Sequence, residues 1–142
     1  DELSAAVGLA QIENIEFLLK EREKIAGWYK KFLAPYQNLL ELPATADSNI
    51  HTWFVYVVLL KNNINRDELI MKLAKEGIAS KPYLPSIHLF TFYKELFGHK
   101  DGDFPISENV SNKAVALPFY IGLKESDIKY IGGKLLNILN EP

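Results

Sequence analysis

The first 33 residues predict a long amphipathic helix. No proline occurs between Asp1 and Leu33, and from Glu13 onward apolar and charged side chains separate onto opposite sides of a helical wheel. Asp1 is suited to cap the first turn. Pro35 would end the helix, because proline cannot continue the backbone hydrogen-bond pattern. We therefore expect one helix over residues 1–34.

The first third of this predicted helix carries no charge between Leu3 and Ile12. Its apolar side chains point in every direction, and a helix that is apolar on all sides is usually buried on all sides. A domain of this size does not surround its own N-terminal helix completely, so a missing part of the protein or a partner chain would have to cover it. The alternative is that the alanines and the glycine of this stretch are simply tolerated at a surface.

Beyond Pro35 the pattern alternates between short strands and helices, after a segment, 35–49, that shows little pattern. Apolar residues occupy both faces of Thr52–Leu60, which is typical of a central strand. The order of the elements predicts an α/β (α+β) domain over residues 35–142, with a small mixed or mostly antiparallel sheet of about three strands flanked by helices and preceded by the long N-terminal helix. The further strands expected are Ile78–Ser80 and Ala114–Leu117, and the helices expected run from Asn65 or Asp67 to Gly77, Leu89–Phe97, Pro105–Lys113 and Lys124–Leu139.

Composition narrows the classes of function. The 142 residues suffice for one domain with a core, and the absence of cysteine excludes disulfides and thiolate chemistry. A formal net charge of -2 with interspersed signs offers no basic patch for nucleic acid or an anionic membrane. The apolar run Trp53–Leu60 is far shorter than the roughly 20 residues that span a bilayer. We expect a cytoplasmic protein without nucleic-acid or membrane partners. Because the sequence starts at Asp1 instead of methionine, we also expect a piece of a longer product or a processed chain.

The segment Ser80–Leu89 holds the most informative polar residues. Its two prolines restrict their own φ angles and those of the residues before them, so the segment should be a stiff, irregular scaffold. On this scaffold stand a cation, an aromatic hydroxyl and an imidazole, which are Lys81, Tyr83 and His88. Such groups on a stiff loop are candidates for binding a ligand. The alternative is a structural connector in which His88 satisfies a buried carbonyl.

Other kinds of site find little support in the sequence. His51, His88 and His99 lie in separate segments without the spaced acidic or imidazole partners of a helical metal site. Gly132–Gly133 lies inside a helical pattern, which indicates close packing or a weak point and not a phosphate-binding loop. No serine stands in a nucleophile-elbow motif. The chain therefore carries binding groups without a recognisable set of catalytic residues.

Three stretches together resemble one family. Residues 2–12, ELSAAVGLAQI, are similar to a motif (S/T)EL-x-AA-(I/L/V)-GLAQL, and residues 81–89, KPYLPSIHL, resemble the start of RPYF-P-PIHLQPFY. Residues 102–108, GDFPISE, followed by ALPF at 116–119, are similar to a closing segment G-x-FP-x-(A/S)E … LP. In this order the motifs resemble the C-terminal part of the DegT/DnrJ/EryC1/StrS sugar aminotransferases, which use pyridoxal phosphate on a fold type I scaffold.

This resemblance implies that the cofactor-binding residues lie in another part of the protein. In the family, the lysine that forms the Schiff base, the aspartate that pairs with the pyridine nitrogen and the phosphate-holding residues lie upstream of the helix with which this chain begins. Residues 1–34 would then be a connecting helix toward an absent large domain, and residues 35–142 the C-terminal small domain. The large domain and a homodimer partner would cover the charge-free first helix. The fragment by itself is expected to be inactive.

The resemblance also implies roles for residues of the proline segment, as one wall of a substrate cleft. Lys81 would be a counter-charge to a phosphate or carboxylate, and Tyr83 and His88 would be hydrogen-bonding groups. Trp53 and Phe90 are further, apolar candidates. The family commonly has arginine where this chain has Lys81, whose point charge lacks the planar, two-pronged geometry of arginine. No residue of the fragment is expected to be catalytic, to bind the cofactor or to hold a metal.

The expected function is that of part of a pyridoxal-phosphate-dependent nucleotide-sugar aminotransferase. Such an enzyme transfers an amino group, usually from glutamate, to a keto-sugar carried on a nucleotide, and serves polysaccharide or glycoconjugate synthesis. Two alternatives stay open. Within the family, a sugar dehydratase shares the scaffold and differs mainly in the cofactor-bearing residue. Outside it, a stand-alone α/β ligand-binding or regulatory module would associate through the first helix.

Overall fold

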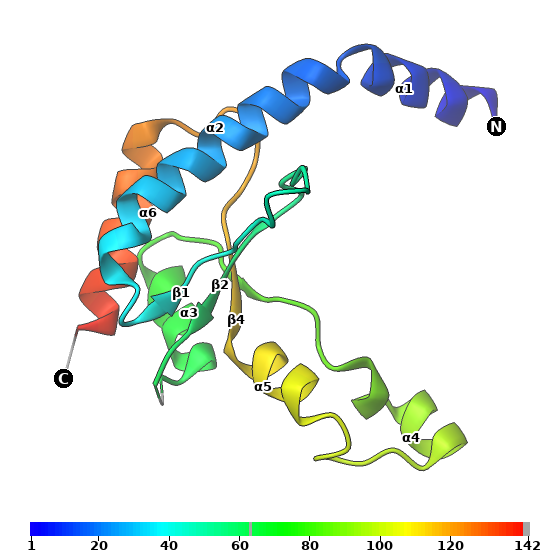
Figure 1. Ribbon diagram of the computed structural model, residues 1–142, viewed down its shortest axis with the longest axis vertical. Coiled ribbons are helices and arrows are strands. Elements are labelled where there is room, and N and C mark those ends of the chain that lie inside the picture. The colour runs from blue at the N-terminus through cyan, green and yellow to red at the C-terminus, as the bar shows by residue number, and fades with distance from the viewer. Residues whose placement is uncertain (63, 141–142) are drawn as a thin grey trace.

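The computed structural model describes residues 1–62 and 64–140. In the described part of the chain the sheet runs in the order β1-β2-β4-β3, with antiparallel pairing at each step. Helices flank this sheet and others precede it, which confirms the expected α/β class (Figure 1). The elements are α1 (Glu2–Glu13), α2 (Ile15–Leu33), η1 (Ala34–Tyr36), β1 (Leu40–Glu41), β2 (Tyr56–Leu60), α3 (Arg66–Lys75), β3 (Lys81–Pro82), η2 (Ile87–Leu89), α4 (Thr91–Phe97), α5 (Pro105–Lys113), β4 (Ala114–Leu117) and α6 (Glu125–Leu139).

The N-terminal segment forms two helices in place of the one that the sequence pattern predicts. Asn14 separates α1 from α2. Its side-chain amide donates a hydrogen bond of 2.8 Å to the Ala10 carbonyl, and its backbone N–H bonds to the Gln11 carbonyl at 3.2 Å. These bonds close the last turn of α1, because a short amide side chain competes with the helical backbone for its carbonyls. At the other end, Asp1 accepts a 2.6 Å hydrogen bond from the N–H of Ser4, as expected of a cap.

The sheet has four strands within the described residues, one more than the sequence predicts. The extra strand, β1, comes from the segment 35–49, and two residues are too few to show a period. β3 lies at Lys81–Pro82, whereas the sequence placed a strand at Ile78–Ser80. The N–H of Ile78 instead closes the end of α3 by bonding to the Leu73 carbonyl at 3.0 Å. β3 is an edge strand, so its proline, which has no N–H, removes no hydrogen bond between two inner strands.

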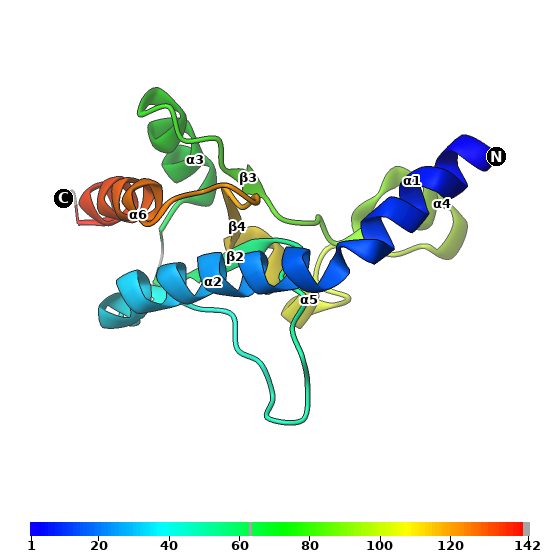
Figure 2. The ribbon, with the colours of Figure 1, turned by 90° about the horizontal axis from the view of Figure 1, so that it is seen from above.

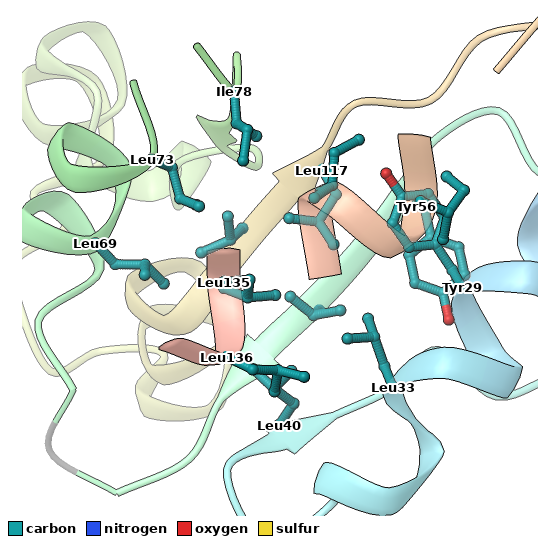
Figure 3. Packing of buried hydrophobic residues seen from close by; sticks show 14 of the residues in the cluster. Tyr29, Leu33, Leu40, Tyr56, Leu69, Leu73, Ile78, Leu117, Leu135 and Leu136 are labelled. Atoms are coloured by element: carbon teal, nitrogen blue, oxygen red, sulfur yellow. The ribbon is translucent and has the colours of Figure 1, made fainter. Parts of the chain in front are cut away.

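One face of the sheet packs against α2, α3 and α6. Alternate residues of β2, which are Tyr56, Val58 and Leu60, point to this face and are buried. Figure 3 shows Leu73 of α3 and Leu135 of α6 pointing into the same cluster of buried side chains. The main core therefore lies on this side of the sheet.

Tyr29 ties α2 to the end of β4. Its ring stacks on Tyr56 with the centroids 4.6 Å apart, and its hydroxyl donates a 2.7 Å hydrogen bond to the Pro118 carbonyl. Burial, together with the neighbouring tyrosines, raises the pKa of Tyr29, and burial raises the pKa of Tyr56 to about 12. Both hydroxyls stay neutral near pH 7, and that of Tyr29 is a hydrogen-bond donor within the core.

Helix α6 approaches α2 closely at Gly132. A Cβ atom at this position would lie 2.5 Å from the ring of Phe32, whereas a Cβ at Gly133 would meet nothing within 4 Å. Close packing, one of the two meanings that the sequence left open for this glycine pair, therefore applies to Gly132. Gly133 has no such steric requirement.

The opposite face of the sheet carries the segment 83–113 with α4 and α5. Val57 and Leu59 of β2 point to this face and are only half-buried. Figure 1 shows α4 and α5 extending away from α2 and α6. This side of the sheet is covered incompletely, and it positions the candidate site.

Helix α1 projects from the body of the molecule, and none of its residues is buried (Figures 1 and 2). Leu3 is 81% exposed and Ile12 is 68% exposed. The charge-free stretch thus has no cover within the described residues. No helix in this part of the chain combines the length and the apolarity needed to cross a membrane.

Candidate functional site

The proline segment is fixed at two points. On the sheet side, β3 pairs with β4, and the N–H of Tyr83 bonds to the Ala114 carbonyl at 3.4 Å. Leu84 then takes a positive φ of 42°, and its carbonyl accepts a 3.2 Å hydrogen bond from the Ser111 hydroxyl on α5. A non-glycine residue at positive φ persists only where the surroundings hold it. These anchors give the segment the stiffness that its prolines predict.

A hollow of about 780 Å³ lies between the proline segment, β2 and α5. Tyr83 and His88 stand among its walls, together with apolar side chains from β2, α4 and α5. A largely apolar hollow of this volume with a few convergent polar groups is typical of small-molecule sites. The apolar residues include Val57, Leu59, Tyr93, Phe104, Ile106 and Val110.

A second hollow, of about 430 Å³, adjoins the first along the same segment, since Tyr83 and Leu84 line both. Its walls are more polar and include Arg66 from the start of α3. The guanidinium of Arg66 is already engaged, because it donates to the Ser111 carbonyl at 2.7 Å and pairs with Asp67 at 2.7 Å. Arg66 therefore holds α3 against α5 and is not a free cation.

The structure brings two of the three predicted binding residues together. Tyr83 and His88 both line the larger hollow, whereas Lys81 is exposed on β3 and lines neither hollow. Phe90 lines the smaller hollow. Trp53 lies apart from both, on the segment between β1 and β2 that Figure 2 shows as a projecting arm, and its ring stacks on His51 with centroids 4.0 Å apart.

His88 is 9% exposed, and two contacts hold its ring. Its Nε2 atom lies 2.9 Å from Oε1 of Glu108, and its ring packs edge-on against Phe104 with centroids 4.7 Å apart. Glu108 also accepts hydrogen bonds from the N–H groups of Gly102 at 3.0 Å and Phe104 at 3.1 Å. The partner of His88 is thus a carboxylate on α5 and not a backbone carbonyl.

The carboxylate of Glu108 is ionised near neutral pH. Burial alone would raise its pKa, but the hydrogen bonds from Phe104, Gly102 and His88 outweigh burial, and the pKa is lowered. A second carboxylate, that of Asp103 just before α5, behaves alike: its pKa is lowered, chiefly by the hydrogen bond from the N–H of Lys100. Both carboxylates therefore act as acceptors for the loop backbone.

Glu108 is a residue of the site that the sequence analysis did not single out, although it ends the third family-like stretch. A local signal was present, since an acidic side chain one turn after Pro105 can turn back onto the free N–H groups at a helix start. The contact with His88 had no such signal, because 20 residues separate the partners. Arg66 was missed for the same reason, since its partner carbonyl on Ser111 lies 45 residues away.

The described residues do not supply a lysine for a Schiff base, so pyridoxal phosphate does not fit this part of the chain alone. No described lysine is buried, and none lines either hollow. Lys134 pairs with Glu76 at 2.6 Å, which raises its pKa, whereas a Schiff-base lysine needs a lowered pKa. Groups of three or more possible metal ligands are also absent from the described residues. The two hollows offer hydrogen-bonding and apolar side chains, and no lysine among those that line them.

Comparison with known proteins gives relatives over nearly the whole chain. The sequence model of the DegT/DnrJ/EryC1/StrS aminotransferase family matches residues 1–136. GDP-perosamine synthase of Caulobacter vibrioides is 32% identical over 139 residues, which cover 96% of this chain and 37% of the relative. The spore coat polysaccharide biosynthesis protein SpsC of Bacillus subtilis is 30% identical over 131 residues, which cover 89% of this chain and 33% of the relative.

The fold agrees with this assignment. The crystal structure of a DegT DnrJ EryC1 StrS aminotransferase from Brucella abortus superposes with a TM-score of 0.77 at 27% identity, over 94% of this chain and 34% of that one. The chain thus spans about a third of the length of the relatives that it matches. It belongs to the DegT/DnrJ/EryC1/StrS aminotransferase family.

Proposed function

We propose that this chain is the C-terminal small domain of a pyridoxal-phosphate-dependent nucleotide-sugar aminotransferase. The observation that carries the proposal is the family match over residues 1–136, in a chain that spans about a third of its relatives. When bound in the intact enzyme, the cofactor supplies the chemistry that moves an amino group from a donor, here glutamate, to a keto-sugar. The residues of this chain bind and orient the sugar nucleotide.

The larger hollow supports this role through its mixed lining. Tyr83 and His88 would hydrogen-bond the polar groups of the sugar, while the apolar walls from β2 and α5 exclude water. Lys81 would act as counter-charge to a phosphate from outside the hollow. It is exposed and has no ion-pair partner in the described part of the chain, so its ammonium is available to an anion.

The exposure of α1 supports a cover from the large domain and a homodimer partner. All of its apolar side chains face solvent in this chain. A large-domain segment and a second subunit would remove that apolar surface from water, which is the main favourable term in most protein association.

The test is a kinetic comparison in the intact enzyme. Purified protein with pyridoxal phosphate and glutamate is expected to aminate a keto-sugar nucleotide. Lys81→Ala and Tyr83→Phe should each raise KM for the sugar nucleotide by roughly tenfold, the effect of losing one hydrogen bond or charge contact. Lys75→Ala, which removes an exposed lysine on α3 that lines neither hollow, is the matched control. Unchanged KM in both site variants would show that the proline segment is only a connector.

A further inference from the structure

Glu108 joins three parts of the site through one oxygen atom. Its Oε1 accepts the N–H of Phe104 at 3.1 Å, shares the N–H of Gly102 with Oε2 at 3.0 Å, and lies 2.9 Å from Nε2 of His88. The ionised Glu108 carboxylate has no proton to donate, and its Oε1 already accepts the N–H of Phe104, so it acts as acceptor toward the imidazole as well. The proton in this contact therefore sits on Nε2 of His88.

The other ring nitrogen of His88, Nδ1, is left without a hydrogen-bond partner in the described part of the chain. It is also not a buried atom, because Ser80 Oγ alone, among the described side chains, is both buried and unpaired. Nδ1 thus keeps some contact with solvent, on a ring that is 9% exposed and lines the 780 Å³ hollow. A neutral imidazole with its proton on Nε2 presents Nδ1 as an acceptor.

Two further rings restrict the imidazole. Phe104 packs edge-on with centroids 4.7 Å apart, and His99 stands perpendicular to His88 at 6.1 Å. A 180° flip of the ring would put Cε1 in the place of Nε2 and break the bond to Glu108. The neighbouring pair uses the opposite nitrogen, since Nδ1 of His99 lies 3.4 Å from Oδ2 of Asp103. The two histidines therefore differ in a way that can be measured.

We propose that Glu108 is a positioning residue that holds His88 as its Nε2–H tautomer, so that Nδ1 accepts a hydrogen bond from a hydroxyl or amino group of the ligand. The proposal rests on the function proposed above, in that the ligand is a sugar nucleotide or its aminated form. His88 would then accept a hydrogen bond from a donor group of the sugar. It would not bind phosphate, because phosphate oxygens are themselves acceptors. Binding of the anion falls to Lys81.

A first experiment measures the tautomer without reference to activity. Solid-state NMR of the intact enzyme labelled with ¹⁵N in histidine distinguishes protonated from unprotonated ring nitrogens, and His88→Gln identifies the His88 signals by their loss. At a pH where the ring is neutral, we expect a protonated Nε2 and an unprotonated Nδ1. Glu108→Ala should give a mixture of both tautomers, whereas Asp103→Asn should leave the His88 signals unchanged. A protonated Nδ1 in the wild-type protein would overturn the proposal.

A second experiment separates positioning from a purely structural role. Glu108→Ala should raise KM for the sugar nucleotide by about tenfold with a smaller change in kcat. Glu108→Gln keeps an acceptor oxygen for the N–H groups of Gly102 and Phe104, and should show a smaller effect in the same direction. Analogues of the sugar that each lack one hydroxyl or amino group test the contact directly. The analogue without the group that donates to His88 should bind the wild type more weakly than the parent sugar does. In Glu108→Ala the analogue and the parent sugar should bind equally well.

The outcomes distinguish this proposal from the proposed function. If the intact enzyme transfers no amino group to any keto-sugar nucleotide, the proposed function fails and the spectra still decide the tautomer. If the enzyme is active and Tyr83→Phe impairs it, but Glu108→Ala leaves both the tautomer and KM unchanged, the positioning role of Glu108 is wrong.

Discussion

Individual residues differ in how far their type decides their role. Asp1 caps α1, and Gly77 ends the turn after α3 at a φ of 74°, a conformation that glycine adopts without steric cost. Both roles follow from local backbone chemistry, and the sequence predicts both. Gly132 is different, because its need for a missing Cβ comes from Phe32 on another helix. His88 is similar: its type marks a binding group, but its partner Glu108 is known only from the fold.

The glycine pair of α6 offers a prediction with an internal control. Gly132→Ala should lower the free energy of unfolding by roughly 1–3 kcal/mol, because the new methyl group must displace the Phe32 ring. Gly133→Ala has free space and should raise the same quantity by about 0.5–1 kcal/mol through helix propensity. Urea denaturation of the three proteins measures both. Equal effects of the two substitutions would contradict the close approach of α2 and α6.

Among the helices and strands, the longer and more periodic elements are predicted correctly, and the shortest ones are not. α5 and β4 lie where the sequence places them, and α6 begins within one residue of its expected start. β1 and β3 have two residues each, so neither can show a period, and their pairing partners decide their existence. The break between α1 and α2 depends on a single side chain, Asn14, within an otherwise continuous helical pattern.

Glu108, in the first turn of α5, makes the stability of the fold sensitive to acid. The pKa of Glu108 is lowered in the folded state, so this carboxylate stabilises the fold above its unfolded pKa of about 4.5 and loses that contribution as pH falls through the folded value. The difference in free energy of unfolding between wild type and Glu108→Gln should be steady near neutral pH and shrink on acidification below about pH 4.5. Chemical denaturation across a pH series measures it.

The control for this experiment is Glu95→Gln, which removes an exposed carboxylate on α4 that has no recorded hydrogen bond or ion pair in the described part of the chain. That variant should show no comparable change between neutral and acid pH. The opposite result is that the wild type becomes more stable relative to Glu108→Gln as the pH falls. That result would exclude the stabilising role of the Glu108 carboxylate.

The whole molecule has a well-packed half and an uncovered half. α2, α3 and α6 bury one face of the sheet, while α1 and the 83–113 segment expose large apolar side chains, among them Leu3, Leu84 and Ile106. Where such exposed side chains form a patch, the patch usually marks an interaction site. Membership in the DegT/DnrJ/EryC1/StrS family, over a third of the relatives' length, gives a consistent reason for it.

The exposure of α1 predicts that the 142-residue chain self-associates in solution. Sedimentation velocity should show species larger than a monomer, because the apolar surface of α1 is removed from water in the contact. Leu3→Lys combined with Leu9→Lys should shift the distribution toward monomer, whereas Met71→Lys, which changes an exposed residue on α3, should not. A clean monomer in which α1 is well ordered would count against the need for a cover.

The sequence by itself determined the α/β class, the helical character of the N-terminal segment, the stiff proline segment and the family, because each of these depends on local backbone preferences or on motifs of consecutive residues. Only the tertiary structure decided the four-stranded order, the hollow, the separation of Lys81 from Tyr83 and His88, and the Glu108 contact. These features join residues far apart along the chain, and no local pattern encodes such a distance. The proline segment shows both cases: its stiffness comes from its own prolines, and its chemistry depends on a carboxylate that α5 brings to it.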